Sequence, residues 1–229
     1  MAAVVTGISP LFHYYAYGYC ADILSAALLV AGLGLVFSQR GFLAGLVLGI
    51  SVWAKLPNVI GLGLAAGMLL ITGKRRTLMS LGLGSSVGLG LFGAINWYMF
   101  SAPWTTGYQK VMIVERGEVR LSTHMSSFGL PFFKGLSLQL TDTTHGLLPT
   151  AWSSVLGFLG GLFLITRKSA ALITMLLFML VTFLFYCKYD FVSASGYSNR
   201  FLMPAVALSA IPLAVLLDRL VGTQSGSST

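Results

Sequence analysis

The stretch GFLAGLVLGISVWAKLPNVIGLGLAAGMLLITGKRR, residues 41–76, decides the fold class. Two apolar runs in it are separated by Lys55-Leu56-Pro57-Asn58 and closed by three basic residues. Pro57 suits the first turn of a new helix, because the N–H group that proline lacks would be unpaired there. We predict a tight hairpin of two helices over 41–55 and 57–72. The alternative is one kinked helix, which would put Arg40 and Lys74 on opposite sides of a membrane.

The composition extends this apolar character to the whole chain. Of the 229 residues, 56% are hydrophobic and 9% charged, with a mean hydropathy of +0.85, whereas a soluble domain carries about 25% charged residues. The net charge of +8 would suggest nucleic acid in a soluble protein. Here half of the basic residues lie in tight turns between apolar runs. We therefore expect an integral membrane protein whose partner is the lipid bilayer, with no nucleic-acid partner.

Basic residues also predict the topology, because short cytoplasmic loops are enriched in Lys and Arg. We place seven of them in the cytoplasm: Arg40, Lys74, Arg75, Arg76, Arg167, Lys168 and Arg219. The helices then run over 22–37, 41–55, 57–72, 77–100, 147–166, 169–187 and 201–218. The predicted fold class is an all-α polytopic transmembrane bundle of about seven crossings in the plasma (inner) membrane. Residues 1–100 and 147–220 form its two membrane parts, and residues 221–229 a disordered cytoplasmic tail.

The long segment 101–146 is predicted to lie outside the cytoplasm. Val111–Val114 and Val119–Leu121 flank four charged or turn-forming residues, a pattern typical of a small hairpin. Residues 128–140 are amphipathic and begin with Gly129 and Pro131, which favours an interfacial helix lying on the membrane. Loops of this length are usually functional or disordered, and the interleaved aromatic residues favour an ordered one.

Aromatic side chains are distributed unevenly in this topology. All nine Tyr and all four Trp fall in the outer half of the protein. An aromatic belt is one interpretation, although such belts normally form at both membrane interfaces. The other is an outer cavity that binds sugars or an isoprenoid chain, since ligand pockets are rich in aromatic side chains.

Three ionisable residues near the membrane are candidates for a site, because burying a charge there is expensive. Asp22 begins the first predicted helix, where an acid also complements the helix dipole. Lys55 either extends its amine to the interface or neutralises a phosphate. Arg200 precedes the last helix, as an anchor or as a ligand for phosphate oxygens, which its guanidinium fits well.

A fourth candidate, His145, follows Asp142, Thr143 and Thr144. A helix cap explains the acid and the threonines, whereas the histidine has either a structural role or acts as an acid, a base or a phosphate contact. The sequence has no Cys or His metal cluster, no Ser-His-Asp motif and no Gly-rich phosphate loop. Its two cysteines, Cys20 and Cys187, are read as free thiols, and a bridge between them is the alternative, since both fall near the outer ends of predicted helices. Local motifs alone therefore name no reaction.

Three stretches together resemble one family, the polytopic C-fold glycosyltransferases that use polyprenyl-phosphate sugars. This family includes protein mannosyltransferases and lipid A aminoarabinose transferases. The first stretch contains Ser9-Pro10, an aromatic run, Asp22 and Lys55-Leu56-Pro57. The second contains Trp104-Thr105-Thr106-Gly107-Tyr108, Phe128-Gly129-Leu130-Pro131 and His145-Gly146-Leu147-Leu148. The third is Asn199-Arg200-Phe201-Leu202-Met203-Pro204.

The resemblance implies transfer of a sugar from a polyprenyl-phosphate donor to an acceptor hydroxyl on the outer face. It implies that Asp22 assists the acceptor or binds a divalent metal, which is the one cofactor that the resemblance suggests. It assigns Lys55, His145, Arg200 and Tyr108 to the lipid phosphate or the substrate. Basic groups of this kind stabilise a leaving phosphate, and a carboxylate helps to deprotonate an acceptor.

The chain departs from the family at its start. Family members have a further N-terminal helix and an outer loop that bears their main catalytic acid, but no acid precedes Asp22 here. We therefore expect a truncated chain that is inactive alone. A non-enzymatic transporter or scaffold subunit is the alternative, although a transporter would show paired broken helices and only one break is found, at Pro57. A third hypothesis is a different lipid-linked transferase, such as an acyltransferase using His145.

Overall fold

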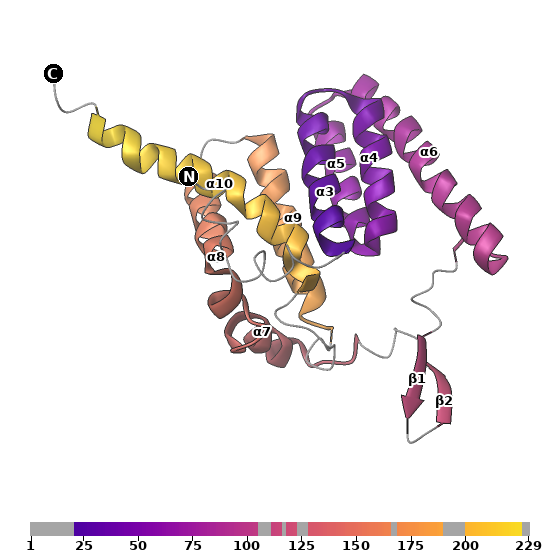
Figure 1. Ribbon diagram of the computed structural model, residues 1–229. Coiled ribbons are helices and arrows are strands. Elements are labelled where there is room, and N and C mark those ends of the chain that lie inside the picture. Colours follow the sequence, from indigo (N-terminus) through magenta and orange to yellow (C-terminus); the bar gives the residue numbers. More distant parts are fainter. Residues whose placement is uncertain are drawn as a thin grey trace.

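The computed structural model describes residues 21–104, 111–115, 118–122, 128–165, 169–189 and 200–225. Within them the chain is helical apart from one two-stranded antiparallel hairpin (Figure 1). The first helices are α3 (Ala21–Phe37), α4 (Gly41–Ala54), η1 (Leu56–Asn58), α5 (Val59–Ile71) and α6 (Arg75–Phe100). After the strands β1 (Val111–Glu115) and β2 (Glu118–Ser122) come α7 (Phe132–Thr141), α8 (Leu147–Leu164), α9 (Ala170–Tyr186), η5 (Arg200–Leu202) and α10 (Met203–Ser225).

Three helical segments are long and apolar enough to cross a membrane: Arg75–Phe100, Leu147–Leu164 and Arg200–Leu220. This indicates a membrane protein. The other apolar helices are shorter; α4, for example, has 14 residues, about 21 Å at 1.5 Å per residue, against a hydrocarbon core of about 30 Å. The crossings predicted for these shorter helices stay predictions.

Two similar turns connect the first four helices in pairs. Gln39 and Gly73 both have positive φ, 59° and 70°. The next residue in each turn donates its backbone N–H to a carbonyl five residues earlier, Arg40 to Leu35 and Lys74 to Leu69. This bond is typical of a helix ended by a left-handed residue. The helices α3 and α5 therefore each end abruptly at the turn where the sequence predicts basic residues on the cytoplasmic side.

Helices α4 and α6 pack closely because both present glycines to each other. A side chain at Gly45 would meet the backbone of Leu81, and one at Gly84 would meet the backbone of Phe42, at about 2 Å. Small residues permit such close approach of helix backbones in lipid. The contacts advance together along both helices, from Gly41 beside Thr77 to Gly49 beside Ser85. Helices α4 and α6 are therefore parallel.

The direction of α5 follows from this parallel pair. Because α4 and α6 run the same way, α5, which connects them along the chain, runs in the opposite direction. The break at Lys55 is therefore a reversal of the chain rather than a kink. The side chain of Thr77 donates to Gln39 at 3.2 Å, so the two basic turns lie next to each other. This excludes the single kinked helix with Arg40 and Lys74 on opposite sides. We call the end of the bundle with these turns the basic end, and the opposite end, with Lys55, the site end.

The second half of the chain forms the other part of the bundle (Figure 1). Helix α8 packs mainly on α10, and α10 also contacts α3. Residue Ala151 has non-helical backbone angles, so the first turn of α8 is set off from the rest by a kink. Helix α7 docks at the site end, where Gly135 lies directly against the Cys187 carbonyl and Gln139 donates to the Tyr186 carbonyl at 2.9 Å.

The predicted loop elements occur, with shifted limits. Val111 pairs with Ser122 and Glu115 with Glu118, so the small hairpin is confirmed and adds two strands to a fold predicted as all-α. Helix α7 begins after Pro131, and its position on a membrane surface stays a prediction. The disordered tail was expected from residue 221, whereas α10, which includes Pro212, continues to Ser225.

The α4–α6 contact can be tested with two glycines of one helix. We expect Gly84→Ala to lower the stability of the detergent-solubilised protein by about 1–3 kcal/mol, since overpacking costs that much. Gly82→Ala, which has no atom within 4 Å of the added carbon, gains helix propensity and should stabilise by up to about 1 kcal/mol. The measurement is the denaturation midpoint of each variant. Equal shifts in both would contradict the packing.

Candidate functional site

Three charged residues from distant parts of the chain meet at the site end. Asp22 is in the first turn of α3, Lys55 lies between α4 and η1, and Arg200 begins η5. The Lys55 amine contacts one carboxylate oxygen of Asp22, and the Arg200 Nε lies 3.9 Å from the other. Lys55 also donates to the backbone carbonyl of Arg200 at 3.1 Å. All three residues were selected from the sequence as separate candidates.

The reversal between α4 and η1 directs Lys55 inward. Lys55 has extended backbone angles, and Pro57 lies in the helical turn η1 that follows. The buried Asn58 secures the reversal, since its Nδ2 donates to the Ser25 hydroxyl at 2.8 Å and to the Ser51 carbonyl at 3.1 Å. These bonds connect α3, α4 and η1. They lie about one helical turn further from the site end than the Lys55–Asp22 ion pair. A buried polar network of this kind is stable only when its groups are paired.

Phe201 joins the charges to an aromatic cluster. The Lys55 amine is 5.1 Å and the Arg200 guanidinium carbon 5.4 Å from the centre of its ring. Cations at such distances are attracted to the face of an aromatic ring. Phe201 in turn stacks on Tyr186 and meets Tyr189 edge to face, and Phe128 packs on Tyr189. This group of four rings, called the aromatic cluster below, forms one wall beside the charges.

The charges differ in their access to solvent. The side chains of Lys55 and Asp22 are 9% and 13% exposed, whereas that of Arg200 is 41% exposed. Two cations beside one carboxylate leave the cluster with a formal charge of +1. Arg200 presents that charge at the surface, and a guanidinium can bind two oxygens of one phosphate or carboxylate. The arrangement is therefore suited to an anion and gives Asp22 two cationic partners.

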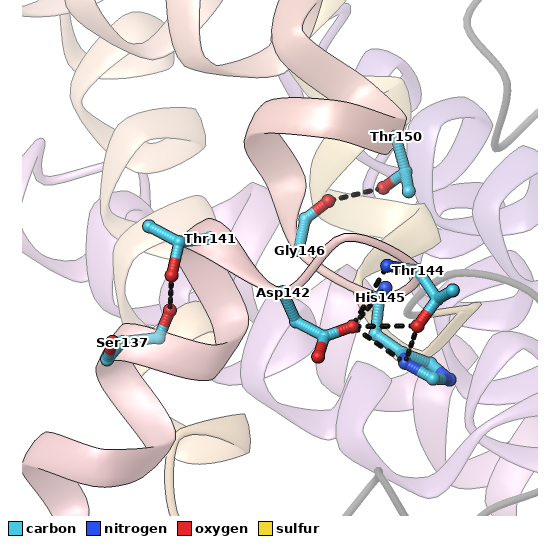
Figure 2. A network of polar contacts seen from close by, with 7 residues as sticks. All are labelled: Ser137, Thr141, Asp142, Thr144, His145, Gly146 and Thr150. Atoms are coloured by element: carbon cyan, nitrogen blue, oxygen red, sulfur yellow. Dashed lines mark hydrogen bonds and ion pairs between the residues drawn. The ribbon is translucent and has the colours of Figure 1, made fainter.

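His145 belongs to a separate polar group before α8, drawn in Figure 2. One oxygen of Asp142 accepts the backbone N–H groups of Thr144 and His145 at 3.0 and 2.8 Å. The same oxygen accepts the Thr144 hydroxyl at 2.8 Å and lies 3.0 Å from His145 Nδ1. Burial raises the pKa of Asp142, but these hydrogen bonds together lower it more, to about 2 from an ordinary 3.8.

The aromatic cluster contacts the charges through Phe201 and lies close to the residues that follow the Asp142 group. Leu147, two residues after His145, packs in the same apolar cluster as Phe201, Tyr186 and Tyr189. His145 and Arg200 therefore border one region of the site end. Tyr108 lies outside the described residues, as does Cys20, while Cys187 is a buried free thiol. In the described part of the chain, no three His, Cys, Asp or Glu residues are grouped so as to hold a metal ion; the divalent metal stays a prediction.

Sequence reasoning missed two parts of this site. It treated Asn58 only as part of the helix break, although an asparagine directly after a proline between two apolar runs was a signal for a hydrogen-bonded reversal. It also gave Phe201 no role of its own, yet an aromatic residue next to Arg200 is a natural partner for a cation. Asp142 was read as a helix cap, but α8 has Gly146 at its N-cap and no side-chain cap. Asp142 instead accepts the N–H groups of Thr144 and His145 in the turn before α8 and holds the His145 ring.

The fold and the site together indicate a class, a helical membrane protein with a charge cluster buried at one end of its apolar bundle. Comparison with protein-family models, with curated proteins and with solved structures gives no match. The function must therefore be argued from the site itself.

Removing one partner of the Lys55–Asp22 pair should be costly. Asp22→Asn or Lys55→Met leaves the other charge buried, which costs about 3–5 kcal/mol. The double variant should lose less than the sum of the two single losses, by about 1–3 kcal/mol, because contacting residues are coupled. Unfolding free energies of the four proteins in detergent test this. Additive losses would mean that the two side chains do not depend on each other.

The Asp142 group should give a pH-dependent contribution to stability. Its pKa is lowered in the folded protein, so the stabilisation is complete above pH 4 and disappears as the pH falls from about 4 to about 2. The partly screened carboxylate should contribute about 1–2 kcal/mol. Denaturation midpoints of the parent and Asp142→Asn should differ at pH 6 and converge near pH 2. A difference that is the same at both pH values would contradict the role of this carboxylate.

Proposed function

We propose that the protein is a membrane glycosyltransferase that transfers a sugar from a polyprenyl-phosphate donor to an acceptor hydroxyl at the site end. One observation carries this proposal. Asp22, Lys55 and Arg200, which the family resemblance implicates in the reaction, lie within one cluster although 178 residues separate the first from the last. A cationic group with a formal charge of +1 beside aromatic rings suits a phosphate and a sugar.

The geometry favours particular roles for these residues. Arg200 is the exposed cation and binds the donor phosphate, whose negative charge grows as the bond to the sugar breaks. Lys55 is nearly buried, so it adds positive charge to the site without contacting the phosphate directly. It also holds Asp22 and the Arg200 carbonyl in place. Phe201 and Phe128, the partly exposed members of the aromatic cluster, offer apolar surface to the sugar or to the first units of the lipid. His145, Tyr108 and Asp22 keep the substrate-side roles that the resemblance implies.

The proposal includes a topology of seven crossings with the site end outside and the C-terminus in the cytoplasm of the plasma membrane. The side-by-side basic turns at Arg40 and Lys74 support it, because short cytoplasmic turns are enriched in such residues. The shorter helices fit a membrane that thins locally. In the described residues, Trp53 packs near the site end of α4, and Trp97 and Tyr98 lie in the last turn of α6.

A non-enzymatic scaffold is the second candidate. The nearly buried ion pair favours it, since Lys55 and Asp22 satisfy each other and join three helices without any substrate. The two functions differ in what they require of Arg200. A scaffold tolerates loss of this exposed cation, whereas a transferase that binds a lipid phosphate does not.

The test is transfer of a radiolabelled sugar from polyprenyl-phosphate donors in membranes that contain the chain, alone and extended by any upstream coding sequence. We expect Arg200→Gln to raise the KM for the donor at least tenfold, with Arg200→Lys in between because it keeps the charge but loses the second contact. Lys134→Gln, an exposed cation on α7, is the matched control and should leave KM unchanged. Absence of transfer by both chains would overturn the enzyme and leave the scaffold.

A further inference from the structure

The carboxylate of Asp22 lies beside both cations of the charge cluster, which consists of Asp22, Lys55 and Arg200. One of its oxygens contacts the Lys55 amine, and the other lies 3.9 Å from the Arg200 Nε. The second distance is longer than a hydrogen bond of about 2.9 Å, so charge alone holds this nitrogen near Asp22. Arg200 is therefore placed to bind a ligand while Lys55 and Asp22 stay paired.

The charge of Asp22 acts on any anion that Arg200 binds. Asp22 and Lys55 are nearly buried, and partly buried charges are screened less by salt than exposed ones. Among these three residues, Asp22 cancels one of the two cations and leaves a formal charge of +1. Asp22 repels a phosphate at Arg200, and it repels a phosphate with two negative charges twice as strongly as one with a single charge.

The proposed reaction brings two phosphates of different charge to this place. The acceptor hydroxyl forms a bond to the anomeric carbon of the sugar as the bond from that carbon to the phosphate oxygen breaks, and the hydroxyl proton is lost to water. The donor is a phosphodiester, which carries one negative charge. The lipid that remains is a phosphate monoester, which carries about −1.5 to −2 at pH 7. The site therefore meets both charge states in every reaction cycle.

We propose that Asp22 is a specificity-determining residue that selects the phosphodiester of the donor against the lipid monophosphate left after transfer. A formal charge of +1 neutralises a phosphodiester, whereas a monoester leaves one negative charge uncompensated beside an apolar bundle, which is costly. The used lipid is then released in preference to the donor. This inference rests on the proposed function, since it concerns the phosphate of that donor, and it gives Asp22 a role that needs neither the acceptor nor a metal.

Competition binding to the purified chain in detergent tests this with two ligands that lack a sugar. Radiolabelled methyl farnesyl phosphate, a diester, is displaced near pH 8 by the same unlabelled diester or by farnesyl monophosphate. We expect the parent to bind the diester at least threefold more tightly. Asp22→Asn changes the formal charge of the cluster from +1 to +2, so the ratio of diester affinity to monoester affinity should fall at least fivefold. Lys55→Met changes the formal charge to zero and should raise this ratio.

The double variant Asp22→Asn/Lys55→Met separates the effect of charge from that of folding. It removes both members of the buried pair and restores the formal charge of +1 through Arg200, so its ratio should equal that of the parent even if a single variant fails to fold. Arg75→Gln removes an exposed positive charge at the basic end. It is the matched control for Lys55→Met and should leave the ratio unchanged.

A ratio that is unchanged in Asp22→Asn, or that differs from the parent in the double variant, would overturn the selection by Asp22. Because the ligands contain no sugar, this result would leave the glycosyltransferase proposal intact. Binding of neither lipid by the parent would overturn the selection together with the assignment of Arg200 to the donor phosphate. Absence of sugar transfer beside the expected ratios would overturn the enzyme and keep the selective phosphate site.

Discussion

The contact between Lys55 and Asp22 is the interaction on which the arrangement of the site end depends. An amine or a carboxylate alone would be costly in an apolar helical bundle, so each residue holds the other at the site end. Lys55 reaches Asp22 only because the chain reverses after Ala54, and Asn58 fixes that reversal by bonding to Ser25 and Ser51. The backbone carbonyl of Arg200 then brings the start of α10 to the same place. Helices far apart in the sequence therefore meet around one pair of charges.

Apolar runs and the residues that interrupt them were enough to predict most helices of the bundle. The hairpin at Pro57 followed from local chemistry. Gly41, Gly45 and Gly49, and likewise Gly84 and Gly88, recur every four residues in the sequence. Which helices those glycines join was not visible, because packing partners depend on the path of the chain. The parallel pair of α4 and α6 emerges only in the structure. The continuation of α10 to Ser225 was missed because a polar, Ser-rich stretch was equated with disorder.

The sequence predicted which residues belong to the candidate site, but it did not predict that they lie together. Asp22, Lys55 and Arg200 were selected one by one, as costly charges near a membrane, and each had an adequate local explanation. Their meeting depends on a three-dimensional path that composition does not encode. His145 shows the opposite case, since its partner Asp142 is only three residues away. The pattern of Asp, Thr and His within four residues indicated a local polar group, although the group closes the turn before α8 and does not cap the helix. Short-range arrangements are readable in this sequence, and long-range ones are not.

The constant register between α4 and α6 has a consequence for how this gene tolerates change. Gly41, Gly45 and Gly49 face Thr77, Leu81 and Ser85, so contacting positions stay 36 residues apart. One residue inserted into α6 before Gly84 would rotate that glycine by about 100° away from α4. The same insertion beside Gly73 would lie in a turn, which can absorb the additional residue without rotating either helix. Length variation in related chains should therefore be found at the turns and be rare within these two helices.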